Sequence, residues 1–97
     1  MIKYGSRLGY ICRRVALDGK TTFKYREGMV TAVRLGKAGT RVYSKEFMPQ
    51  DLEDIGDNTD IVAGKDGLIL VNEVFETNDD LAERCQKWCE YANEHGA

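Results

Sequence analysis

The stretch LGYICRRVALDGKTTFKYRE, residues 8–27, decides the fold that the sequence predicts. Residues 8–16 and residues 21–27 are rich in β-branched and aromatic side chains, which favour strands. Between them lies Asp18-Gly19, and an Asp-Gly pair favours a tight hairpin because both central residues of a type I′ turn need positive φ. The sequence therefore predicts an antiparallel hairpin near the start of the chain.

A second hairpin is expected directly after the first. Residues 29–35 alternate, so that one face would carry Met29, Thr31, Val33 and Leu35 and the other Val30, Ala32 and Arg34. A loop from Gly36 to Gly39 leads into a strand over residues 40–47, which Pro49 ends because proline has no N–H to donate to a sheet. The first half thus predicts four strands in meander order.

The most regular pattern of the chain is a helix that follows residue 77. Thr77 with Asp80 resembles a capping box. After it, one helical face repeats apolar residues: Leu81, Ala82, Cys85, Trp88, Cys89 and Ala92. Between the two halves we expect one helical turn over residues 50–55, with Leu52 and Ile55 inward, and short strands over residues 61–63 and 68–75.

These elements define an α+β fold. We expect a small, mostly antiparallel sheet, a meander of hairpins that could be barrel-like, with one C-terminal amphipathic helix packed on it. The 97 residues are enough for one modest core, so residues 1–97 are expected to form a single domain.

Two segments carry a resemblance. VFETNDDLAERC, residues 74–85, is similar to the ending of many short uncharacterised proteins of Firmicutes and their phages, in which a strand ending V-F-x-T precedes x-E-E-A at a helix start. EGMVTAVR, Glu27 to Arg34, resembles an upstream stretch of the same proteins. Asp79-Asp80-Leu81 departs from the Glu-Glu-Ala of that pattern. The resemblance implies the fold and a phage or mobile-element origin, and it implies no active site.

Composition restricts the class of protein. Hydrophobic residues make up 42% of the chain and charged residues 31%, which is typical of a folded soluble domain. No apolar run approaches the roughly 18 residues that cross a bilayer, and charges interrupt the N-terminal segment as they would not in a signal peptide. Three cysteines without framework spacing favour a reducing compartment. We therefore expect a cytoplasmic protein that does not bind membranes.

No residues indicate catalysis or a bound cofactor. The one histidine, His95, is the third residue from the end, and no nucleophile motif accompanies it. Cys85 and Cys89, at i and i+4, could share a metal with Cys12 or His95, but free cysteines on an apolar helix face more often pack in a core. GKAG and AGKDG lack the phosphate-loop pattern. We expect a protein that is not an enzyme and that has no metal or cofactor.

Charge is sorted along the chain. Residues 1–47 hold eleven Lys or Arg against three acids, a net charge of +8, whereas residues 48–97 hold three against thirteen, a net charge of −10. The two halves could simply complement each other inside the fold, or each could face a partner.

Three binding hypotheses follow. In the first, an acidic surface meets the basic groove of a host protein that acts on nucleic acid, such as a defence nuclease, as an anti-CRISPR or other anti-defence inhibitor would. That surface would comprise Asp51, Glu53, Asp54, Asp57 and Asp60. In the alternative, the basic hairpins bind nucleic acid directly. The residues expected for it are Arg13, Arg14, Lys24, Arg34 and Arg41, with Tyr25 and Arg26 nearby. A third possibility is an oligomeric accessory protein of a mobile element.

Overall fold

Five strands and one long helix make up the part of the chain that the computed structural model describes, residues 2–56 and 71–95. The strands are β1 (Arg7–Val15), β2 (Thr21–Gly36), β3 (Gly39–Ser44), β4 (Gln50–Asp51) and β5 (Phe75–Glu76), with the short 3-10 helix η1 (Leu52–Asp54) and the helix α2 (Asp79–His95). They form one sheet in the order β4-β3-β2-β1-β5, and each neighbouring pair is antiparallel. The predicted α+β class is confirmed.

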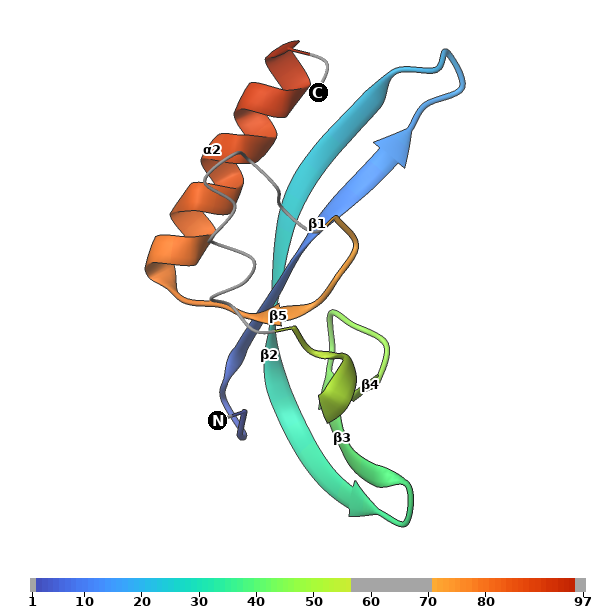
Figure 1. Cartoon of the computed structure of the whole chain (residues 1–97), viewed down its shortest axis with the longest axis vertical. Helices are drawn as coiled ribbons and strands as arrows, with labels where there is room; N and C mark the ends of the chain where they lie inside the picture. Colours follow the sequence, from blue (N-terminus) through green and yellow to red (C-terminus); the bar gives the residue numbers. More distant parts are fainter. Residues whose placement is uncertain (1, 57–70, 96–97) are drawn as a thin grey trace.

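Strand β2 is the central strand of the sheet, and its length differs from the prediction. Its first half pairs with β1 as far as Met29, and its second half pairs with β3 from Val30 onward (Figure 1). The prediction of separate strands over residues 21–27 and 29–35 is therefore wrong. Gly28 marks no turn: a Cβ at this position would lie 2.5 Å from the Phe47 ring, so glycine is needed because another segment crosses the strand here.

The turn between β1 and β2 also differs in type. Gly19 has a φ of 85°, whereas Asp18 does not take positive φ, so the expected type I′ turn is wrong. The N–H of Gly19 donates to the carbonyl of Ala16 over 2.9 Å, which closes a turn around residues 17–18 that ends on a left-handed glycine. The Asp18 carboxylate then accepts from the N–H of Lys20 over 2.9 Å.

A β-bulge changes which side chains of β2 are buried. The pairing with β3 shifts between Val30 and Ala32, which leaves Thr31 as the extra residue. Val30 is fully buried, while Met29 and Leu35 are exposed. The expected alternation, with Met29, Thr31, Val33 and Leu35 on one face, does not continue through the bulge, because the extra residue puts Val33, opposite the buried Val42, on the face of Val30.

Helix α2 covers one face of the β1–β2 ribbon (Figure 1). Its predicted apolar face is confirmed, because Leu81, Ala82, Cys85, Cys89 and Ala92 form a core cluster with Ile11, Phe23, Tyr25 and Phe75, and Trp88 packs against it half-buried. The cap is Asn78 rather than Thr77: its side-chain oxygen accepts the Leu81 N–H over 3.0 Å.

A second core cluster joins Leu8, Val30 and Val42, and Phe47, Ile55 and Val74 pack against it. Strand β3 ends at Ser44, earlier than the predicted residue 47, and the following bend brings Phe47 back over β2. Ile55 points inward as predicted, but Leu52 is 39% exposed, so that part of the expectation is wrong.

The predicted strand over residues 61–63 and the start of the one over 68–75 lie outside the described residues. Among residues 71–75, Val71 makes a single parallel bridge to Ile11, and Phe75 alone belongs to a strand, β5. Within residues 2–56 and 71–95, no helix has the length and apolar character to cross a bilayer.

Candidate nucleic-acid interface

The register of β1 and β2 sorts their side chains onto two faces. Residues directly opposite each other in an antiparallel pair point to the same face, and the face alternates along each strand. Ile11 and Tyr25 are such a pair, and both lie under α2 in the first core cluster. The neighbouring pairs must therefore point to the opposite face. We call this the basic strand face, formed by the pairs Tyr10 with Arg26, Cys12 with Lys24, and Arg14 with Thr22.

The basic strand face carries three cations and no acid. The side chains of Arg14, Lys24 and Arg26 are exposed, and a hollow of about 340 Å³ lies among them. None of the three forms an ion pair with another residue of the described ranges. Uncompensated charges of one sign around a concavity raise the local concentration of an oppositely charged partner.

The cations of the helix are in a different situation. On α2, Arg84 Nε lies 3.1 Å from Asp80 Oδ2, and Lys87 Nζ lies 3.0 Å from Glu83 Oε1. These positive charges are compensated within their own element, and α2 carries further acids. The two sides of the ribbon therefore differ in sign, which a net charge of −2 for the whole chain conceals.

A second hollow, which we call the ring hollow, continues from the basic strand face at Tyr10. It measures about 260 Å³ and its lining includes Tyr10, Glu46, Phe47, Met48, Gln50 and Asn72. The rings of Tyr10 and Phe47 meet edge to face, with centroids 5.1 Å apart and an interplanar angle of 65°. Its wall thus combines aromatic faces, two amides and one carboxylate.

Asn72 has an unusual backbone at the edge of the ring hollow. Its φ of 66° is left-handed, a conformation that asparagine tolerates better than most residues. Its N–H donates to the carbonyl of Ile11 over 2.8 Å, and its side-chain oxygen accepts a long bond of 3.4 Å from the N–H of Arg13. These bonds fix Asn72 against the edge of β1, where it forms part of the lining of the ring hollow.

The basic residues expected from the sequence do not form one surface. Arg14 and Lys24 lie on the basic strand face, but Arg13 is paired with Phe23 and so points to the other face. Tyr25, expected to supply an aromatic ring for binding, is buried under α2.

Arg34 and Arg41 are directly opposite each other on β2 and β3. They point away from the side of Val42, which packs in the second core cluster, and so belong to a separate surface. Arg34 lies over the ring of Tyr43, 5.9 Å from its centroid. Arg41 Nε donates to Asp51 Oδ1 over 2.9 Å, and this hydrogen bond raises the pKa of Arg41.

The acidic surface is only partly described. Asp51 is held by Arg41, so one predicted acid is paired with one predicted base. Glu53 and Asp54 are exposed on η1. Asp57 and Asp60 lie outside the described residues.

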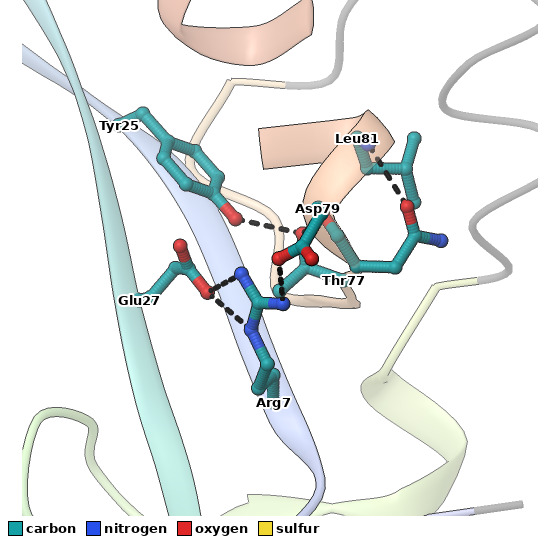
Figure 2. Close-up of polar contacts among 7 residues, drawn as sticks. Arg7, Tyr25, Glu27, Thr77, Asp79 and Leu81 are labelled. Atoms are coloured by element: carbon teal, nitrogen blue, oxygen red, sulfur yellow. Dashed lines mark hydrogen bonds and ion pairs between the residues drawn. The ribbon is translucent and has the colours of Figure 1, made fainter. Parts of the chain in front are cut away.

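A polar network on the helix side holds α2 in position (Figure 2). Arg7 of β1 reaches Glu27 of β2, with Nη2 2.8 Å from Oε1, and also Asp79 in the first turn of α2. The hydrogen bond with Asp79 is the main reason that the pKa of Arg7 is raised. Close by, the Tyr25 hydroxyl bonds the Thr77 hydroxyl over 2.7 Å, and burial raises the pKa of Tyr25 to about 12. These contacts fasten the helix to one face, and the basic strand face lies on the other.

Sequence reasoning missed Tyr10, and it named Arg26 together with cations that lie on other surfaces. The signal that could have separated the faces is alternation: Tyr10, Cys12 and Arg14 alternate with the buried Ile11, as Lys24 and Arg26 alternate with the buried Phe23 and Tyr25. The wall supplied by Phe47 and Gln50 depends on the chain crossing β2 at Gly28, which no local pattern indicates.

No protein-family model matches the chain, and searches of curated proteins and of solved structures find no significant similarity to it.

Proposed function

We propose that the protein binds nucleic acid through the basic strand face. The observation that carries the proposal is the grouping of Arg14, Lys24 and Arg26 on one face of the β1–β2 ribbon, without an acid among them and around a hollow. Small sheets hold nucleic acid in this way, with cations along the phosphates and an aromatic ring beside them. Tyr10 supplies such a ring on the same face.

An acidic isoelectric point of about 5.4 is unusual for a nucleic-acid-binding domain. The arrangement of the charges explains how a chain with an acidic isoelectric point can have a basic binding face. Five acids of α2 contribute to the total charge from the opposite side of the ribbon, namely Asp79, Asp80, Glu83, Glu90 and Glu94. A phosphate backbone on the basic strand face meets the local field, and that field is positive.

The test compares two variants that have the same net charge. One replaces Arg14, Lys24 and Arg26 by Gln, and the matched control replaces Arg34, Arg84 and Lys87 by Gln. Affinity for a labelled single DNA strand is measured by fluorescence anisotropy. If each of the three cations neutralises one phosphate, the first variant binds roughly 50-fold more weakly at about 0.15 M salt. The control variant keeps most of its affinity. Equal losses in both variants would contradict the proposal, because they would reflect total charge alone.

The second candidate function is the anti-defence inhibitor with an acidic surface. Its support is the exposure of Glu53 and Asp54 in the first turn of η1, where neither forms an ion pair within the described part of the chain. A basic groove on a host nucleic-acid-acting protein, such as a defence nuclease, would be the complementary partner. Asp51 contributes less, because Arg41 already compensates its charge.

Affinity capture on immobilised variants distinguishes the two candidates. A lysate freed of nucleic acid by nuclease treatment is passed over the immobilised protein and over its Glu53→Gln, Asp54→Asn variant. A protein that the parent retains and this variant loses, and that the variant of the basic strand face still retains, supports the acidic surface. Retention by every variant alike would remove this candidate.

A further inference from the structure

The ring hollow suggests which form of nucleic acid the protein takes, an inference that rests on the proposed function. The hollow adjoins the basic strand face through Tyr10, whose ring lines it. From Tyr10 to Arg14 the strand advances about 13 Å at roughly 3.3 Å per residue. A bound strand could therefore extend over the cations and reach the ring hollow without leaving the surface.

The charge changes at this boundary. The charged side chains of the basic strand face are all cations, whereas the wall of the ring hollow includes Glu46 and has no Lys or Arg among the lining residues that belong to the described part of the chain. A carboxylate repels a phosphate, so the hollow disfavours the backbone of a nucleic acid. The same carboxylate can accept a hydrogen bond from the amino group of a base.

The remaining groups suit a flat, polar-edged ring. Tyr10 and Phe47 offer aromatic faces, and the side-chain amides of Gln50 and Asn72 can donate to or accept from a base edge. The Gln50 amide already donates one hydrogen bond, to the carbonyl of Met48 over 3.2 Å, which holds its side chain in place. At about 260 Å³ the hollow is smaller than the roughly 300 to 1,000 Å³ of sites for larger ligands.

We propose that the ring hollow receives one unpaired base of a single strand whose phosphates lie along the basic strand face. A duplex keeps its bases paired and stacked and cannot supply one without opening. The protein is therefore selective for single strands.

The experiment measures the anisotropy of three labelled DNA probes of equal length: an intact single strand, an abasic strand with the same phosphates, and a duplex. The base contributes through stacking, so the wild-type protein binds the abasic strand roughly 5- to 100-fold more weakly than the intact one. It also binds the duplex more weakly than the intact strand. Equal affinity for intact and abasic strands, or a preference for the duplex, overturns the inference.

Two variants locate the effect. Tyr10→Leu keeps an apolar side chain on the strand but loses one of the two aromatic rings, so the difference in affinity between intact and abasic strands becomes smaller. The matched control, Tyr91→Leu, removes an exposed tyrosine on α2, and it keeps the wild-type difference. A Tyr10→Leu protein that still distinguishes the two strands as the wild type does would overturn the role of the ring.

The outcomes separate this inference from the proposed function. If wild-type protein binds both single strands equally and the variant of the basic strand face loses both, the base site is wrong and the phosphate site stands. If no probe binds, both are wrong.

Discussion

Replacing Gly28 by Ala tests whether the crossing of β2 by the segment after β3 determines the sheet. Three atoms of that segment lie within 3.0 Å of the added Cβ: Phe47 Cε2 at 2.5 Å, Ser44 Oγ at 2.7 Å and Glu46 Cβ at 2.8 Å. Real Cβ atoms essentially never approach other atoms this closely. The segment from Ser44 to Phe47 must therefore move away from the strand.

Two opposing effects determine how much stability the Gly28→Ala protein loses. Forcing one extra carbon into a packed site costs about 1–3 kcal/mol. Restricting the unfolded chain at a position without positive φ returns about 0.4–1 kcal/mol. We expect Gly28→Ala to lower the free energy of unfolding by about 1–2 kcal/mol, and therefore the melting temperature by about 5–15 °C.

The assay is thermal and urea unfolding, followed by circular dichroism, with Gly36→Ala as the control. A Cβ at Gly36 would have its nearest neighbour, the Gly39 carbonyl oxygen, at an ordinary 3.5 Å. We expect this control to be as stable as the wild type or slightly more so. A Gly28→Ala protein with unchanged stability, or an equal loss in both variants, would refute the packing argument.

Three further predictions concern the helix side. Trp88→Ala should lower the free energy of unfolding by about 2–3 kcal/mol, because Trp88 is half-buried and meets Phe23 edge to face at 5.1 Å. This loss is smaller than the roughly 3–5 kcal/mol expected for a fully buried tryptophan. Urea unfolding measures it, and an unchanged midpoint would place Trp88 outside the core. Asn93→Ala should speed amide hydrogen exchange at Phe23. The Phe23 N–H donates to the Asn93 side-chain oxygen over 2.7 Å, and the Asn93 amide nitrogen donates to the Phe23 carbonyl over 3.0 Å. Unchanged exchange would show that these bonds do not protect the open edge of β2. Stability should fall as the pH rises from about 9 to about 11, because burial raises the pKa of both Cys85 and Cys89 from 9.0 to about 11, so the unfolded thiols lose their protons first. The fall should be smaller in the Cys85→Ala, Cys89→Ala variant, and an equal fall in both proteins would contradict this assignment.

The sequence predicted correctly those elements that depend on residues close together in the chain. The helical repeat of Leu81, Cys85 and Cys89 placed the buried face of α2 correctly, because one packed face is enough to produce that spacing. The two hairpins were also predicted, since each strand pair is adjacent in the chain.

The errors have long-range causes. Gly28 resembles a strand end in the sequence, and only the contact with Phe47 explains why the strand continues through it. Thr77 has the spacing of a cap, yet its hydroxyl is bonded to Tyr25, 52 residues earlier, and Asn78 caps the helix instead.

The sequence indicated a basic surface but did not show which residues share it. The excess of cations in residues 1–47 pointed to a basic surface, and Arg14 and Lys24 belong to it. Selecting cations by type grouped Arg13 and Arg34 with them, although register places those two on other surfaces. The pairing of Arg41 with Asp51 depends on β4 lying beside β3, so it required the structure.

The salt dependence of single-strand binding tests the central claim most directly. The affinity of the wild-type protein for a labelled single strand is measured from about 50 to about 200 mM salt. Three phosphate contacts predict a slope of about −2 for the logarithm of affinity against the logarithm of salt concentration. Arg26→Gln should reduce the steepness of that slope by about 0.7, as expected for one contact. A slope near zero, or a slope that Arg26→Gln leaves unchanged, would contradict binding by the basic strand face.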